Sequence, residues 1–411
     1  MADKTKFYAA GFKSQQDEFA IGFDGQSIEQ NIARLIDASS TETSLRDAFE
    51  LCKSNQWNFG RAKARLSQLN WRNDIQPVLF RPFDRRYIIL HPDVVTNPRL
   101  NVMQHLANNN VAFLATRSST EPFAVFVTNI PPAHKIVGNY DMTIAFPLWL
   151  KPQGTETRTL PKIAPAFADR VAALTGLRYD DGGDAPAQAA FEGVIAPKSE
   201  QVAMFGERRE RGDGGASSFG PRDLFDWIYA VLHSPSYRAR YDDYLKSDFA
   251  RIPLPEDRAL FQALVPLGTR LIALHLLDAK AAPELNDPKS VRLAGAGEAR
   301  VTFKSSEFEK SAWEGGRMYI AADKSRWFET VPERVANFHI GGYRPARKWL
   351  KDRTASGGKR PSAGRVLSEA DILHYRRMIV AMDQTIDLMA QIDTLIEAHG
   401  GWPDAFRGIV E

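Results

Sequence analysis

The sequence is poor in the residues and patterns that most catalytic chemistry needs. A single cysteine among 411 residues excludes an internal disulfide bond and a zinc cluster built on thiolates. The eight histidines are scattered and lack the close pairing of a metal site. No Gly-x-x-x-x-Gly-Lys-Ser/Thr loop is present, which argues against nucleotide hydrolysis. We therefore predict no metal site and no catalytic residues, and we expect no catalysis by this chain alone.

Long apolar runs are also missing. No stretch approaches the roughly 20 consecutive apolar residues that a membrane-spanning helix needs. The first residues, Met-Ala-Asp-Lys-Thr-Lys, lead into no apolar run of the signal-peptide type. We expect a soluble, cytoplasmic protein without a membrane partner.

Neither sign of charge dominates the chain, because 53 basic and 50 acidic residues give a net charge of +3. The segment from Ile340 to Arg377 differs, since ten basic residues there face three acidic ones, a net of +7. A surface for a polyanion must therefore be local, and this segment is where we expect it.

Two adjacent glycines, Gly341 and Gly342, separate an apolar run from this basic segment. Glycine accepts positive φ at little cost, so the pair predicts a tight turn. Guanidinium groups beside Tyr343 and Trp349 suit a nucleic acid with stackable bases, although a solvated basic helix is the alternative. The candidate DNA-binding residues are Arg344, Arg347, Lys348 and Lys351, with Arg85, Arg86 and Arg117 as a second group; Tyr343 and Trp349 are expected to be stacking or structural.

The length predicts two or three domains in an α+β fold. The expected parts are a helical segment at 1–75, a β-rich recognition part at 76–220 with a flexible linker at 206–220, a helical block with a small β part at 221–365, and a long C-terminal helix at 366–411. Short β-like runs between turn formers favour antiparallel sheets over βαβ units. The expected strands are Arg86–Leu90, Val111–Thr116, Phe123–Thr128, Thr143–Leu150, Val301–Phe303, Met318–Ile320 and Trp327–Thr330.

Helix signals flank these strands. Ser27 and Ser44 are the expected caps of two short N-terminal helices, and Ser368 with Asp371 is the expected cap of the last helix. The apolar row of that last helix is Ile372, Tyr375, Ile379, Met382, Ile386, Met389, Ile392 and Ile396. Its alternating spacing of three and four predicts a spacer that docks against another long helix; an ordinary core helix is the alternative.

Several segments, in order, resemble the C-terminal specificity region of single-chain restriction–modification enzymes, the type ISP and type IIG group. They are Trp57–Lys63, Phe80–Tyr87, Phe146–Leu150, Leu224–Arg238, Asp248–Pro255 and Phe338–Arg353, and the resemblance covers residues 55–398. Within Phe80–Tyr87 we expect Arg81 to pair with Asp84 and pin the strand entry.

The resemblance implies a target recognition domain that reads duplex DNA. In such enzymes a methyltransferase core upstream transfers a methyl group from S-adenosylmethionine to adenine N6. The motifs of that core, of a nuclease and of a helicase are absent from this sequence. We therefore expect the methyltransferase core in the same or another chain, S-adenosylmethionine bound there, and no cofactor in this one. We expect the base-reading side chains on loops within 86–150 and 300–330.

Two other functions are compatible with the residues. One is an S-adenosylmethionine-dependent DNA methyltransferase whose cofactor loop has diverged. The other is a non-catalytic interaction protein that pairs through its long C-terminal helix.

Overall fold

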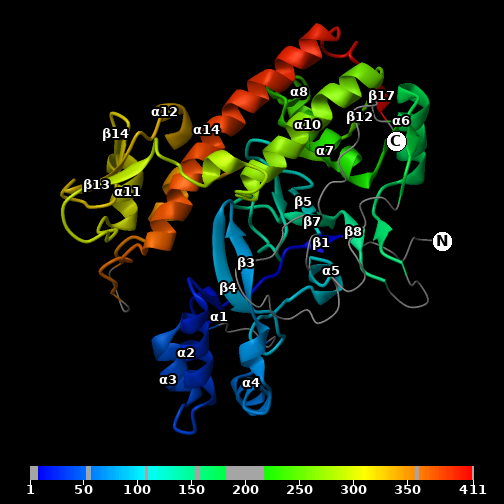
Figure 1. Ribbon diagram of the computed structural model, residues 1–411. Helices are drawn as coiled ribbons and strands as arrows, with labels where there is room; N and C mark the ends of the chain where they lie inside the picture. The colour runs from blue at the N-terminus through cyan, green and yellow to red at the C-terminus, as the bar shows by residue number, and fades with distance from the viewer. Residues whose placement is uncertain are drawn as a thin grey trace.

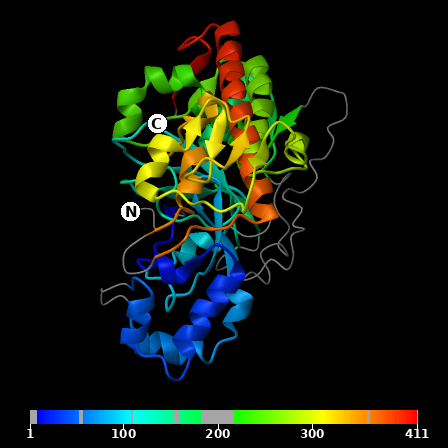
Figure 2. The same ribbon diagram turned by 90° about the vertical axis from the view of Figure 1, so that its left-hand side faces the viewer.

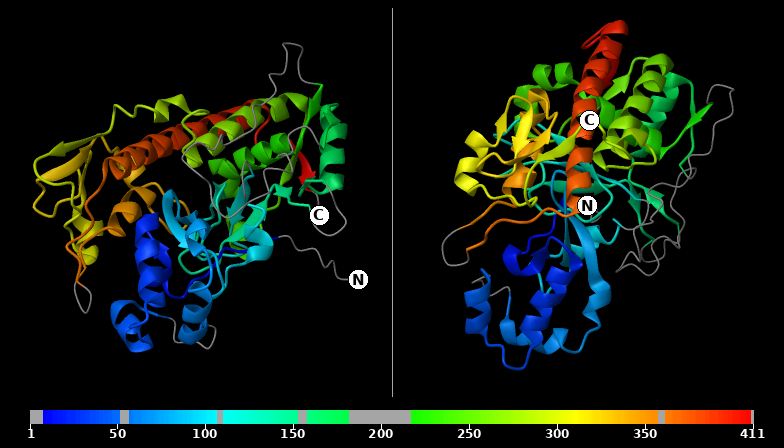
Figure 3. Two further views of the ribbon diagram at one scale, coloured as in Figure 1. Left: turned by 60° about the horizontal axis from the view of Figure 1, so that its bottom comes forward. Right: turned by 60° about the vertical axis from the view of Figure 1, so that its left-hand side comes forward.

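Short helices and small antiparallel sheets alternate along the chain in the computed structural model, which describes residues 8–51, 57–106, 110–152, 158–181, 217–356 and 361–409. Figure 1 shows an N-terminal helical lobe at the bottom, a central β-rich part, and a small sheet at the left, with a long helix running across the top. Figures 2 and 3 show the same lobe projecting from the body in other views. The fold is α+β, as the sequence predicts, and includes the long C-terminal helix.

The N-terminal lobe is built on amphipathic helices. Its elements are α1 (Asp17–Ala20), α2 (Gly25–Ile36), α3 (Glu42–Ala48), α4 (Phe59–Leu66) and a 3-10 turn at Trp71–Asp74. Ile28, Ile32 and Leu35 of α2 are buried, at the spacing that places them on one helical face. The expected caps lie three residues too late, because Asp24 caps α2 and Thr41 caps α3, while Ser27 and Ser44 occupy the third helical positions.

Antiparallel sheets form the central part. One sheet has the order β1 (Ala9–Ala10), β7 (Ile144–Pro147), β5 (Ala112–Ala115), β6 (Val125–Thr128), and another has the order β2 (Ile21–Gly22), β4 (Asp84–Ile89), β3 (Ile75–Arg81). The strands β4, β5, β6 and β7 overlap the runs that the sequence predicted, whereas β1, β2 and β3 were not predicted. Strands from the first 75 residues pair with strands of the next predicted part, so shared sheets join the two parts. The domain boundaries stay a prediction.

Smaller pairings complete the β structure of this half. They are β8 (Trp149–Leu150) with β9 (Leu160–Pro161), β10 (Arg178–Tyr179) with β11 (Ser218–Phe219), and β12 (Pro253–Pro255) with β17 (Phe406–Ile409). The short helix α5 (Leu100–Met103) precedes β5. The expected linker at 206–220 lies mostly outside the described residues. Its last part forms β11, which pairs in parallel with β10.

A layer of helices covers the central sheets. It comprises α6 (Pro165–Thr175), α7 (Pro221–His233), α8 (Pro235–Arg240), α9 (Asp242–Ser247), α10 (Arg258–His275), a 3-10 turn at Pro283–Leu285, and α14 (Glu369–Ala398). The three longest of these pack together through a buried polar chain: the Tyr229 hydroxyl donates to His275 Nδ1 at 2.6 Å, and His275 Nε2 donates to the Thr385 hydroxyl at 3.0 Å. Burial lowers the pKa of His275 to about 3, so this ring is neutral at physiological pH.

The small sheet lies beside the beginning of α14 (Figure 2). Its order is β13 (Arg292–Gly295), β16 (Arg326–Glu329), β15 (Arg317–Tyr319), β14 (Trp313–Glu314), and the helices α11 (Ser305–Ser311), α12 (Glu333–Ala336) and α13 (Pro345–Lys351) accompany it. The expected strand Val301–Phe303 is wrong. Its main chain bonds singly to three separate segments, with Val301 N donating to the Arg365 carbonyl, and so it joins no ladder.

The last helix begins at the predicted cap, because Ser368 and Asp371 form a reciprocal capping box. Its partners are within the chain, since it packs along α10 and α7. The buried row passes through Thr385 and Leu388, where the spacing predicted Ile386 and Met389. A straight α-helix has about 3.6 residues per turn, whereas the coiled-coil pattern repeats every 3.5 residues or so. The buried face of the helix therefore shifts gradually away from the residues of a strict coiled-coil pattern.

A close contact between α10 and α7 suggests a test of how these two helices pack. A Cβ added to Gly268 of α10 would lie 1.8 Å from the Asp226 carbonyl oxygen of α7. We expect Gly268→Ala to push the two helices apart and to lower the free energy of unfolding by about 1–3 kcal/mol. Gly60→Ala in α4 is the control, because its nearest neighbour is 3.5 Å away. Chemical denaturation measures both, and equal stability of the two variants would contradict the packing.

Candidate nucleic-acid interface

The tight turn predicted at the two glycines is present, and it attaches the basic segment to the central β-rich part. Ile340 and Tyr343 exchange main-chain hydrogen bonds of 2.9 and 3.2 Å across the turn. Gly341 has a φ of +57°, and a Cβ there would lie 1.7 Å from the Val137 carbonyl oxygen. Positive φ and this close approach both require glycine. The turn therefore brings the basic segment against the central β-rich part.

Polar side chains of the central part hold the turn in place. Asn139 Nδ2 donates to the Gly342 carbonyl at 2.7 Å and to Glu121 Oε1 at 2.8 Å. The Tyr343 hydroxyl donates toward the Lys135 and Gly138 carbonyls at 3.3 and 3.4 Å. Tyr343 is buried, and burial raises the pKa of its hydroxyl. Its position is structural, and its ring is covered by the loop that it anchors.

The helix α13 divides the four main candidate cations between two faces. Arg344, Lys348 and Lys351 recur at intervals of four and three residues and are partly exposed, so they form one stripe. We call these three residues the α13 stripe. Arg344 pairs with Glu309 at 2.6 Å, and Lys351 reaches the other oxygen of the same carboxylate at 3.7 Å. Lys348 pairs with Asp352 at 2.5 Å.

The opposite face of α13 points into the protein. Arg347 is only 7% exposed, and it donates to the carbonyls of Ala336 and Glu309, each at 3.1 Å. Burial lowers the pKa of its guanidinium. Trp349 is also buried, and the Arg353 guanidinium lies 3.4 Å from its ring centroid. Both side chains thus hold α13 in place from the inner side.

The second group of candidate cations is equally mixed. Arg85 is exposed on β4. Arg86 is largely enclosed, because it pairs with Asp84 at 2.8 Å and its guanidinium lies 3.9 Å from the Phe80 ring centroid. Arg117 is well exposed, with an ion pair to Asp248 at 3.0 Å.

Asp84 is the centre of the junction between the β3–β4 hairpin and the C-terminal part. Its carboxylate is fully buried and accepts from Arg353 Nη2 at 3.0 Å and from Arg86 Nε at 3.0 Å. Arg353, which is itself buried, comes from the turn after α13. Burial alone would raise the pKa of Asp84, but the charges of Arg86 and Arg353 and their hydrogen bonds lower it to about 2.

The ion pair expected between Arg81 and Asp84 is replaced by these two partners. The guanidinium of Arg81 instead lies over the rings of Phe80 and Tyr343, at 4.1 and 5.5 Å from their centroids. Arg81 and Asp84 are paired residues of adjacent strands, but the aromatic rings offer the planar guanidinium a stacking surface. The motif is structural, as expected, through different contacts.

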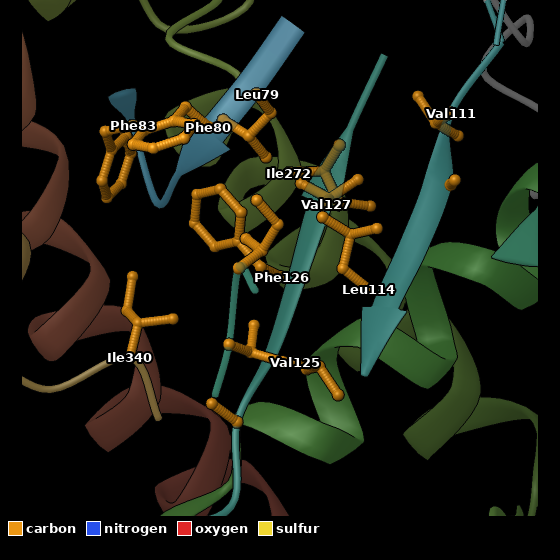
Figure 4. Packing of buried hydrophobic residues seen from close by; sticks show 14 of the residues in the cluster. Leu79, Phe80, Phe83, Val111, Leu114, Val125, Phe126, Val127, Ile272 and Ile340 are labelled. Atoms are coloured by element: carbon orange, nitrogen blue, oxygen red, sulfur yellow. The ribbon is translucent and has the colours of Figure 1, made fainter. Parts of the chain in front are cut away.

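The hairpin also enters the core. Figure 4 shows Leu79, Phe80 and Phe83 of the hairpin on one side of the cluster and Val125, Phe126 and Val127 of β6 beside them. The rings of Phe83 and Phe126 meet edge to face at 5.1 Å. His374 Nε2 donates to the Phe83 carbonyl at 2.7 Å. Apolar packing and the Asp84 ion pairs thus fix the hairpin against the C-terminal part from two sides.

Carboxylates from elsewhere in the chain offset part of the basic segment's charge. Glu309 comes from α11, and Asp84 comes from β4, more than 260 positions away from Arg353. Arg365 lies 3.7 Å from Asp24 and from Asp371. Three carboxylates from outside the segment, Glu309, Asp84 and Asp24, therefore reduce its net charge of +7 in the folded protein. Lys359 and Arg360 of this segment lie outside the described residues.

Within the described ranges, no group of three or more His, Cys, Asp or Glu side chains could hold a metal ion. In the same ranges, no helix has the length and apolar character for a membrane span.

Small antiparallel sheets on a helical frame, joined by buried ion pairs, define an α+β protein of several interlocked parts. Residues 5–391 match the family described as the Type ISP C-terminal specificity domain. Because this match covers nearly the whole sequence, the chain belongs to that family. A comparison with curated proteins found no match.

Solved structures share the fold at low sequence identity. A nuclease-deletion mutant of the Type ISP restriction-modification enzyme LlaGI, in complex with a DNA substrate mimic, has a TM-score of 0.56 and 15% identity over 93% of this chain and 27% of that chain. For the DrdV–DNA complex the values are 0.59 and 17%, over 93% and 35%. For the ATP-dependent Type ISP restriction-modification enzyme LlaBIII bound to DNA they are 0.62 and 12%, over 94% and 23%. This chain thus spans 23–35% of the length of those proteins.

The buried Asp84 predicts a strong stability effect. Asp84→Asn leaves Arg353 charged and unpaired in the interior, and we expect it to lower the free energy of unfolding by about 3–5 kcal/mol at neutral pH. Because folding lowers the pKa of Asp84 from 3.8 to about 2, its stabilisation is complete above pH 4 and is lost as the pH falls toward 2.

Denaturation at several pH values measures this effect. The difference between the wild type and Asp84→Asn should shrink between pH 4 and pH 2. Asp248→Asn is the control, because its ion pair with Arg117 is exposed and should contribute little. If the two variants lost equal stability, the central role of Asp84 would be refuted.

Proposed function

We propose that this chain is the DNA-recognition part of a restriction–modification system and that it reads a short duplex sequence. Membership of the Type ISP C-terminal specificity domain family is the observation that carries the proposal. The similar folds of LlaGI, DrdV and LlaBIII, each determined with DNA, support it.

The recognition part would position a methyltransferase at its target site on the DNA. A methyltransferase core, in the same or another chain, would bind S-adenosylmethionine and methylate adenine at N6. The role of this chain would be to hold the duplex in one register, so that the target base meets that core. A nuclease in the same assembly would be directed by the same recognised DNA sequence.

The α13 stripe is our candidate for phosphate contact, with the exposed Arg85 and Arg117 as further contacts. Lysine and arginine neutralise backbone phosphates and release counterions, which supplies affinity without sequence information. Glu309 and Asp352 hold the stripe's side chains in position in the free protein. A bound phosphate would take the place of one of these carboxylates as the ion-pair partner of the cations. Arg347, Trp349 and Arg86 support the stripe from within.

Sequence would be read by other groups. Side chains on the loops of 86–150 and 300–330 are our candidates for contact with base edges in the major groove, where each base pair presents its own donor and acceptor pattern. In this arrangement phosphate contacts set the register and loop side chains choose the sequence.

Salt dependence of duplex binding tests the α13 stripe. Lys348→Gln with Lys351→Gln removes two cations, and we expect weaker binding and a salt slope reduced by about two. Glu309→Gln removes the carboxylate that competes with phosphate, so it should strengthen binding. Fluorescence anisotropy at several salt concentrations measures both changes.

Lys280→Gln, which removes an exposed charge in the loop after α10, is the matched control and should leave the slope unchanged. If the double variant and Glu309→Gln both bound like the wild type, the α13 stripe would not contact DNA. If the wild type bound no duplex at all, the proposed function would fall.

Arg347 should behave differently from the stripe. Arg347→Met leaves the buried Ala336 carbonyl and the partly buried Glu309 carbonyl without their donor, and we expect a loss of about 1–3 kcal/mol in the free energy of unfolding. Its salt slope at a temperature where the variant is folded should equal that of the wild type. A reduced slope with unchanged stability would show instead that Arg347 contacts phosphate directly.

A further inference from the structure

A cavity of about 340 Å³ lies between the small sheet and the beginning of α14. Two strands and one helix supply its lining, which consists of Arg292, Leu293, Arg326, Glu369, Ile372 and Arg376. Glu369, Ile372 and Arg376 recur at intervals of three and four residues, so they lie on one face of the first turns of α14. None of the residues of the α13 stripe lines this cavity.

Arginine dominates the charge of the cavity. Three guanidinium groups face it, against the carboxylate of Glu369 and that of Glu329, which pairs with the exposed Arg292 at 3.3 Å. Among the described residues, neither Arg326 nor Arg376 has a carboxylate within ion-pair distance. The cations of the α13 stripe all have such partners. Arg326 and Arg376 therefore differ from the cations of the α13 stripe, because carbonyl oxygens and not carboxylates are their partners among the described residues.

The hydrogen bonds of the two inner arginines leave donors free. Arg376 donates from Nε to the Val291 carbonyl at 2.6 Å and from Nη2 to the Pro288 carbonyl at 3.0 Å, which fixes its side chain. Arg326 donates from Nη1 to the Gly295 carbonyl at 2.5 Å. The buried Nε of Arg326 has no partner among the described residues. A donor without an acceptor is costly, so the Arg326 guanidinium gains from any acceptor that its side chain can reach.

Phosphate is the anion that this geometry fits. A guanidinium presents parallel N–H donors that match two oxygens of a phosphate, and Arg326 has such donors free. The first turn of α14 adds a partial positive charge from the helix dipole, and that helix is 30 residues long. The volume exceeds that of a phosphate group alone, which leaves room for an esterified substituent.

We propose that this cavity binds a phosphate group through Arg326 and Arg376, with Arg292 at its rim. The phosphate could belong to the backbone of a duplex or to a free phosphate ester, because the two present the same oxygens. The existence of this phosphate site does not depend on the proposed function. The assignment of its phosphate to a DNA duplex does rest on the proposed function.

Calorimetric titration of the full chain with inorganic phosphate, at constant ionic strength, tests the site. We expect saturable binding that weakens about tenfold or more in Arg326→Gln, because a bidentate contact is lost. Leu293→Glu places a carboxylate in the cavity without removing any arginine and should weaken binding likewise. Arg317→Gln, an exposed arginine on β15 of the same sheet, is the control and should bind like the wild type.

The outcomes separate the possibilities. Equal phosphate affinity in the wild type, Arg326→Gln and Leu293→Glu, or no binding by the wild type, overturns the proposal. If phosphate binds and Arg326→Gln also lowers the duplex salt slope by about one, the source is the DNA backbone. If the slope stays unchanged, the site takes a free phosphate ester. If the wild type binds phosphate and no duplex, the site stands and the proposed function fails.

Discussion

The buried carboxylate of Asp84 is the constraint on which the arrangement of this protein depends. It lies at the tip of a hairpin and accepts hydrogen bonds from Arg86 in the same strand and from Arg353 far along the chain. Burying an ion pair is costly unless its geometry is good and its remaining donors are satisfied. That requirement allows one placement of the hairpin against the C-terminal part, and the turn at Gly341 adds a second fixed point.

The same constraint separates structural cations from exposed ones. Arg347 and Arg353 are buried and hold α13 in place, which leaves the α13 stripe on the outer side. Each cation of the stripe has a carboxylate beside it, so its side chains are ordered before any ligand arrives. The cavity at the beginning of α14 is different, because Arg326 and Arg376 bond to carbonyl oxygens and have no carboxylate partner among the described residues. Charge compensation therefore distinguishes two kinds of cationic surface in one chain.

Local patterns predicted the elements well. The strands predicted at 86–90, 111–116 and 123–128 overlap β4, β5 and β6, and the capped helix after Ser368 begins where predicted. These predictions use β-like runs, turn formers and capping, which depend on neighbouring residues only. Some failures are local, because Asp24 and Thr41 cap the helices whose caps were predicted at Ser27 and Ser44. Others involve contacts between distant segments. Val301–Phe303 has the composition of a strand, but three different segments take its hydrogen bonds. Arg81 stands opposite Asp84, yet the better partner of Asp84 comes from residue 353.

The sequence by itself determined the α+β class, the family resemblance, the glycine turn and the list of cations in the basic segment. Only the tertiary structure decided which of those cations are exposed, because their carboxylate partners, Glu309 and Asp84 among them, come from other parts of the chain. It also brought Arg326 and Arg376 together around one cavity. The physical reason is that charge interactions depend on distance and burial in space, and separation along the chain sets neither.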